Sequence, residues 1–90
     1  MRALMTPESA EIVALKGLAF LVNTPDSLDR FMTLSGTSAG ELRRRAEEPE
    51  FLAALMDFLM SDEKLLTAFC EGESLDAKTL HMARHALPGA

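Results

Sequence analysis

The chain has 90 residues, of which 48% are hydrophobic and 26% are charged, and its formal net charge is −5 at pH 7. A chain of this length forms one domain, so we expect a single helical domain over residues 1–90, in which residues 1–5 and 88–90 are loose. The acidic balance excludes a general electrostatic attraction to the phosphate backbone, which makes nucleic acid an unfavoured partner.

Cysteine content and hydropathy indicate the compartment. Cys70 is the only cysteine, so no internal disulfide can form, which is typical of proteins in a reducing environment. No signal peptide is expected, because acid and proline interrupt the first residues before a long apolar run forms. The apolar runs, such as residues 18–22 and 51–56, fall far short of the about 20 residues that a membrane span needs. These features predict a cytoplasmic protein with no membrane partner.

The composition favours helices, because Leu, Ala and Met are abundant whereas Ile and Val are scarce. Thr6 and Thr24 each precede a proline, which predicts a hydroxyl N-cap followed by proline in the first helical turn. Similar start signals follow at Ser38 with Glu41, which have capping-box spacing, at Glu48-Pro49-Glu50, at Ser61-Asp62-Glu63 and at Asp76. Together these signals predict helices over residues 7–23, 25–35, 38–47, 49–60, 62–72 and 76–87. The expected fold is all-α: a compact single-domain bundle of five or six short helices in orthogonal packing, with a helix-turn-helix-like hairpin.

Two of these helices are rich enough in apolar residues to be central. The helix over residues 7–23 places Ile12, Leu15, Ala19 and Val22 on one stripe, which we expect to face the core. Val13, Phe20 and Leu21 widen this stripe. The helix over residues 49–60 is apolar over most of its circumference. Both helices are therefore predicted to lie inside the bundle.

The segment around Gly36 has the outline of a helix-turn-helix, and its second helix carries Arg43, Arg44 and Arg45. Arginines at such positions can contact phosphates or guanine edges, so these three are candidate nucleic-acid contacts. Any two helices joined at a glycine C-cap give the same outline, however, and Glu47 and Glu48 follow directly. We favour a structural hairpin whose arginines pair with acids four residues later, Arg43 with Glu47 or Arg44 with Glu48. Nucleic-acid binding is kept as the alternative.

No arrangement of side chains indicates catalysis. His81 and His85 are four residues apart on one predicted helix, but no further ligand follows them to complete a metal site. Cys70 occupies an apolar position beside acids, which predicts a structural cysteine rather than a nucleophile. The sequence contains no glycine-rich phosphate loop, GxSxG or CxxC motif. We therefore expect no enzyme, no cofactor and no metal.

The remaining candidate is an apolar surface on the helix over residues 49–60. Met56 and Met60 are spaced to lie on one face, and Asp57 and Glu63 can provide an acidic rim. Methionine-rich patches are typical of surfaces that bind helices. The simpler alternative is that this helix is the core helix. The acidic residues fit either reading, because nine of the fourteen lie in residues 47–90.

The chain also resembles a small bacterial family of all-helical proteins, known as a domain of unknown function. The resemblance covers nearly the whole chain and is carried by Ala19-Phe20-Leu21, Leu28-Asp29-Arg30-Phe31, Ser35-Gly36, Leu42-Arg43, Pro49-Glu50-Phe51-Leu52, Asp57-Phe58-Leu59, Asp62-Glu63, Leu66-Thr67-Ala68-Phe69-Cys70 and Ala86-Leu87-Pro88-Gly89. It implies a compact helical domain and brings no activity, cofactor or catalytic residue.

The leading functional hypothesis is a non-enzymatic protein-interaction module that uses an apolar or acidic helix surface, with an unknown protein or a second copy as the partner.

Overall fold

The computed structural model describes residues 5–88, and this part of the chain is helical throughout, with short connections and no strand. The helices are α1 (Pro7–Val22), α2 (Pro25–Ser35), the 3₁₀ turn η1 (Ala39–Glu41), α3 (Leu42–Arg45), α4 (Pro49–Met60), α5 (Glu63–Glu73) and α6 (Ala77–Ala86). The all-α prediction is confirmed. The expected looseness of residues 1–4 and 89–90 lies outside the described residues.

The third predicted helix is the one that differs most from its expected span. Instead of a continuous helix over residues 38–47, the chain makes η1 and then the single turn of α3. Glu48 is extended, with φ −95° and ψ 118°, because the ring of the following proline disfavours the helical conformation. Pro49 then begins α4, so the acids after the arginines end one helix and start another.

The caps follow the sequence signals with one exception. Thr6 accepts a hydrogen bond from the backbone N–H of Ser9 at the start of α1, as predicted. The carboxylates of Asp62 and Asp76 accept from backbone N–H groups at the starts of α5 and α6. The prediction of a hydroxyl cap at Thr24 is wrong, because its hydroxyl donates to the carbonyl of Phe20 in the preceding helix.

Gly36 ends α2 in the left-handed conformation, with φ 68°, so the predicted hairpin turns at this residue. This conformation costs glycine little because it has no Cβ. The amides of Gly36 and Thr37 return to the last carbonyls of α2. The helix-turn-helix-like outline is therefore present as geometry.

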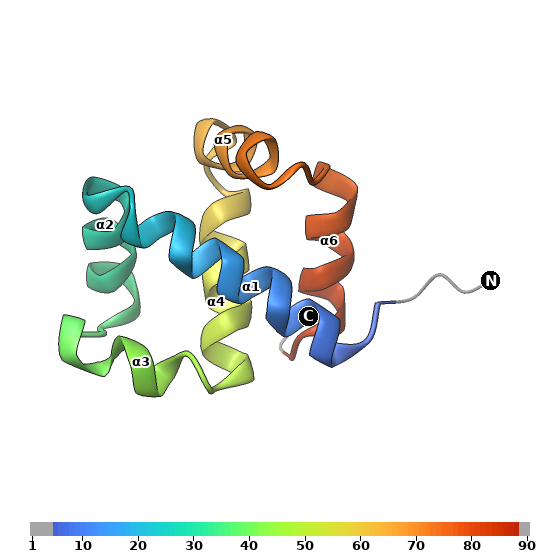
Figure 1. Cartoon of the computed structure of the whole chain (residues 1–90). Helices are drawn as coiled ribbons and strands as arrows, with labels where there is room; N and C mark the ends of the chain where they lie inside the picture. The colour runs from blue at the N-terminus through green and yellow to red at the C-terminus, as the bar shows by residue number, and fades with distance from the viewer. Residues whose placement is uncertain (1–4, 89–90) are drawn as a thin grey trace.

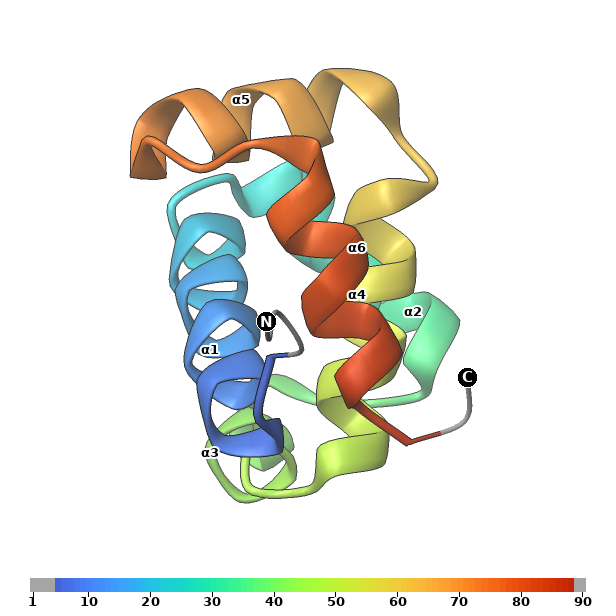
Figure 2. The ribbon, with the colours of Figure 1, turned by 90° about the vertical axis from the view of Figure 1, so that its right-hand side faces the viewer.

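The helix α4 lies in the middle of the bundle. It packs against α1, α2, α5 and α6, and α1 crosses over it in Figure 1. The view in Figure 2, turned by 90°, shows α2, α4 and α6 on one side of α1, while α5 runs across the top of the molecule and reaches past it. The largest fully buried side chains are Leu21, Phe31, Leu52, Leu55, Met56, Leu59, Phe69 and Leu80.

The inner face of α1 is made of small residues. Its buried positions are Ala10, Val13, Ala14, Gly17 and Leu21. A Cβ added at Gly17 would lie 2.7 Å from Cδ1 of Leu59, so glycine allows α1 and α4 to approach closely at this point. The prediction that Ile12, Leu15, Ala19 and Val22 face the core is wrong, because these four residues are exposed. Val13 and Leu21, which widen the predicted stripe, are buried.

Candidate protein-contact surface

The predicted methionine patch on α4 is not exposed as expected. Met56 is 0% exposed, so its placement at a contact surface is wrong. Met60 is partly buried and packs against the core, while Asp57 and Glu63 are exposed. The physical reason is coverage: four helices surround α4 and enclose most of its circumference. The four predicted residues therefore do not form one continuous apolar surface.

Asp57 forms an ion pair within the fold. Its carboxylate accepts a hydrogen bond from Nε of Arg84 at 2.7 Å, which joins α4 to α6. Arg84 also donates to the backbone carbonyl of Pro88 at 3.0 Å. Because Arg84 is mostly shielded from solvent, this pair is a firmer link than an ordinary surface ion pair. Asp57 thus has a structural role in addition to its exposure.

The largest row of exposed apolar side chains lies on the outer side of α1. Ile12 is 56% exposed, Leu15 44% and Val22 53%, and Ala19 between them is also exposed. We call these four residues the α1 seam. The helices α2, α4 and α6 contact α1, and both ribbon views place them away from its outer side. The helix α5 also contacts α1, through the rings of Phe20 and Phe69. The seam is therefore an apolar helix face that no other described element covers.

Leu34 on α2 is still more exposed, at 76%, but it is not part of a row of exposed apolar residues. It is a single large apolar residue at the end of its helix, whereas the α1 seam is a row. Single exposed leucines are common on soluble proteins and need no functional explanation. The row is what distinguishes α1.

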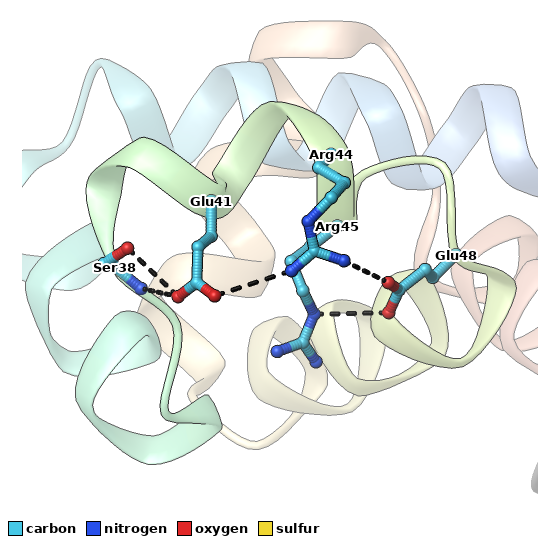
Figure 3. Close-up of polar contacts among 5 residues, drawn as sticks. All are labelled: Ser38, Glu41, Arg44, Arg45 and Glu48. Atoms are coloured by element: carbon cyan, nitrogen blue, oxygen red, sulfur yellow. Dashed lines mark hydrogen bonds and ion pairs between the residues drawn. The ribbon is translucent and has the colours of Figure 1, made fainter.

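The arginine hairpin is held together by its own acids (Figure 3). Arg44 donates to Glu48 at 3.1 Å and to Glu41 at 3.5 Å, and Nε of Arg45 forms an ion pair with Glu48 at 3.2 Å. The Arg45 guanidinium also lies 4.9 Å from the centre of the Phe51 ring, a cation–π contact. Arg43 is exposed and makes no ion pair within residues 5–88. The predicted pairing of Arg44 with Glu48 is confirmed.

Glu41 closes this network on its other side. Its carboxylate accepts from the backbone N–H and the hydroxyl of Ser38, both at 3.0 Å, as expected from their capping-box spacing. These hydrogen bonds, led by the one from the Ser38 backbone, lower the pKa of the Glu41 carboxyl. The hairpin therefore presents carboxylates among its arginines, a poor arrangement for contact with phosphates.

A surface cavity of about 670 Å³ runs beside α6. Apart from Met5, its lining comes from that one helix and includes Lys78, His81, Met82 and His85. A binding site normally gathers polar groups from several elements onto one point, and this groove does not. Within residues 5–88, no group of three or more His, Cys, Asp or Glu side chains is placed to hold a metal ion.

Cys70 is not an activated thiol. It is partly buried against the core, and this burial, together with the negative charge of Asp76, raises the pKa of the thiol. The thiol therefore stays protonated at neutral pH and behaves as a small apolar side chain.

The geometry defines a class: a small all-helical bundle with one uncovered apolar helix face. Residues 7–90 match the family described as "Protein of unknown function (DUF3572)", so the chain belongs to this family, as the resemblance implied. No curated protein and no solved structure matches the chain significantly. No helix in the described part of the chain has the length and apolar character that a membrane crossing requires. The family description names no activity, so the function is inferred from the surface of the bundle.

Proposed function

We propose that the protein is a non-enzymatic, cytoplasmic interaction module whose contact surface is the α1 seam rather than α4. The observation that carries this proposal is the row of three large apolar side chains, each about half exposed, along one helix face. Exposed apolar rows of this kind mark contact sites more often than isolated apolar residues do.

The free energy gained by burying apolar side chains also favours the α1 seam as the contact surface. Full burial of a Val, Leu or Ile side chain contributes roughly 1.5–3 kcal/mol, so about half of that is still available at each large seam residue. A helix that is apolar on opposite faces is normally covered on both of them. In α1 the inner face is covered by the bundle, and the outer face is left for a partner helix.

Two further parts of the proposal, the lack of enzymatic activity and the cytoplasmic location, each have their own support. The polar side chains that line the cavity beside α6 all come from that one helix, and burial raises the pKa of the Cys70 thiol. The single cysteine is consistent with a reducing compartment such as the cytoplasm.

Nucleic-acid binding through Arg43, Arg44 and Arg45 has less support. Two of the three arginines are already paired with carboxylates, and the chain is acidic overall. We expect no binding to mixed-sequence duplex at low salt, where electrostatic binding is strongest. Fluorescence anisotropy with a labelled duplex would measure this, and binding that Arg43→Glu abolishes would favour the alternative.

Photo-cross-linking in the natural host tests the proposed surface. A photoreactive phenylalanine analogue at Leu15 on the seam is compared with the same analogue at Leu34, the exposed leucine on α2. We expect defined protein adducts from position 15 and none from position 34. Equal labelling from both positions, or no adduct from position 15, would overturn the proposal.

A further inference from the structure

The α1 seam has the spacing with which two helices pair along their length. Ile12, Leu15, Ala19 and Val22 are separated by three, four and three residues, which corresponds to the a and d positions of a heptad repeat. Gly17, which faces α4, lies on the opposite side of the helix. One face of α1 therefore packs in the bundle while the other carries a short coiled-coil seam.

Opposite charges border this seam on its two sides. Glu11 directly precedes Ile12, at a g position, and Lys16 directly follows Leu15, at an e position. Glu11 is partly exposed and Lys16 is exposed. In parallel coiled coils, side chains at g and at the e position five residues later meet across the two helices and set orientation and partner choice. Glu11 and Lys16 have this separation and opposite charge.

Building on the proposed function, we propose that the occupant of the α1 seam is the seam of a second copy of this chain. The two α1 helices lie parallel and in register around a twofold axis. Each apolar residue of the seam then meets its own counterpart, and Glu11 of each copy meets Lys16 of the other. The interface is self-complementary, as a symmetric dimer requires.

The charges favour the parallel arrangement over the antiparallel one. If one helix is reversed, each flank meets its own counterpart, so Glu11 lies along the flank of Glu11 and Leu18. Lys16 then lies along the flank of Lys16 and Asn23, and neither charge meets an opposite one. The parallel pair gives two such ion pairs by symmetry.

The size of the seam determines how tightly the two copies are expected to bind each other. It spans about three helical turns, which is small beside the roughly 800 Å² that each partner buries in a standard stable interface. Glu8 continues the stripe at its N-terminal end and is exposed, so its charge limits the apolar seam to four residues. We expect a reversible dimer with a dissociation constant on the order of 10–100 µM.

Sedimentation equilibrium of the purified chain from about 1 µM to 1 mM tests the dimer at the affinity expected above. The average mass should rise from 9.8 kDa toward twice that value. Ile12→Glu should weaken association at least about tenfold, whereas the control Leu34→Glu, at a still more exposed apolar site on α2, should leave it unchanged. Circular dichroism confirms that both variants are folded.

A charge-reversal cycle tests the pairing across the seam. Glu11→Lys and Lys16→Glu should each weaken the dimer by about three- to tenfold, and the double variant should recover most of the wild-type affinity. The two side chains are five residues apart on one helix and do not face each other within a chain. Recovery therefore reports a contact between copies.

Disulfide cross-linking tests the orientation. In a Cys70→Ser background, Ala19→Cys should form a covalent dimer under mild oxidation, because position 19 meets itself only in the parallel pair. Ala68→Cys on the exposed side of α5 is the control and should not cross-link.

The outcomes separate this inference from the proposed function. A mass that stays at the monomer value up to the highest concentration, or a dimer that Ile12→Glu leaves intact, overturns the second-copy proposal. An absence of recovery in the double variant overturns the parallel pairing. If the chain remains monomeric while photo-cross-links from position 15 reach a different protein, the proposed function stands and the second copy is ruled out as the occupant.

Discussion

Helices α1 and α4 have similar apolar content but occupy different places in the bundle. The helix α4 buries seven of its residues: Phe51, Leu52, Ala53, Leu55, Met56, Phe58 and Leu59. The helix α1, which is longer, buries five residues, and most of these are small. Apolar content alone therefore does not decide how much of a helix is buried. What decides is where the neighbouring helices lie: they surround α4, whereas the helices that contact α1 leave its outer side exposed.

Residue size explains how α1 can be apolar on both sides. Where it meets α4, Gly17 and the alanines let the two backbones approach, and a larger side chain would not fit. Leu21 is buried, and Leu18 and Phe20 pack against the core. The other large apolar residues, Ile12, Leu15 and Val22, lie on the outer side of α1.

The largest expected effect comes from placing a charge on each helix. Met56→Glu puts an unpaired carboxylate at a fully buried site in α4 and should cost more than about 4 kcal/mol, enough to unfold much of the population of a small domain. Ile12→Glu on the α1 seam should change the free energy of unfolding by less than about 1 kcal/mol. Urea unfolding followed by circular dichroism measures both. A Met56→Glu protein as stable as wild type would refute the buried position of Met56.

Leucine truncation gives a matched but smaller comparison. Leu55→Ala removes a buried side chain of α4 and should destabilise the fold by about 2–5 kcal/mol through lost burial and a residual cavity. Leu15→Ala on α1 should cost less than about 1 kcal/mol, because its side chain is already half in water. Both values come from urea unfolding at low protein concentration. Equal losses at the two sites would contradict the one-sided burial of α1.

Glycine replacement probes the contact between the two helices. Gly17→Ala gains about 1 kcal/mol of helix propensity, but its Cβ would displace Leu59, which is locked in the core. Overpacking costs about 1–3 kcal/mol, so we expect a net loss on the order of 1 kcal/mol. Gly72→Ala in α5 meets no atom within 4 Å and should stabilise the protein by about 0.5 kcal/mol. Thermal unfolding would show opposite shifts, and a stabilising Gly17→Ala would mean that the helices have room to spare.

Acid should distinguish the α1–α4 pair from the helices that follow it. Backbone hydrogen bonds from Leu65 and Thr79 are the largest causes that lower the pKa values of Asp62 and Asp76, which cap α5 and α6. These carboxylates contribute stability above their ordinary pKa, near 4, and lose that contribution as the pH falls through the lower folded pKa. Thr6 caps α1 with a hydroxyl that does not titrate in this range.

We therefore expect the first turns of α5 and α6 to exchange their amide hydrogens faster below about pH 4, while α1 and α4 stay protected. Amide exchange followed by NMR measures this effect, the smallest of the four. Replacing both aspartates by serine should keep the caps and flatten the pH dependence. If α1 loses protection first, then its hydroxyl cap does not give it the expected independence of pH.

The sequence was sufficient for the local features of the fold. Helix starts depend on neighbouring residues, so Thr6, Asp62 and Asp76 could be recognised as caps, and Gly36 as the turn. Thr24 was not predictable in the same way, because its hydroxyl could equally accept from the next helix or donate to the previous one. The pairing of Arg44 with Glu48 followed from their spacing on one helix.

Coverage by other helices could not be predicted from periodicity. The stripe of Ile12, Leu15, Ala19 and Val22 is a correct helical face, but periodicity does not say whether a face points inward or outward. The only signal was the row of small residues on the other side of α1, which indicates a close approach of two backbones. For the same reason, Met56 could not be assigned to the core or the surface until its neighbours in space were known.

The proposed pairing through the outer face of α1 would link folding to protein concentration. The inner face of α1 completes the core of its own chain, so the seam on its outer face exists only when the chain is folded. A partner bound to the seam therefore binds the native state alone and stabilises it by mass action. The melting temperature should rise as the chain becomes more concentrated, and the amount of protein present would then help to set how much of it is folded.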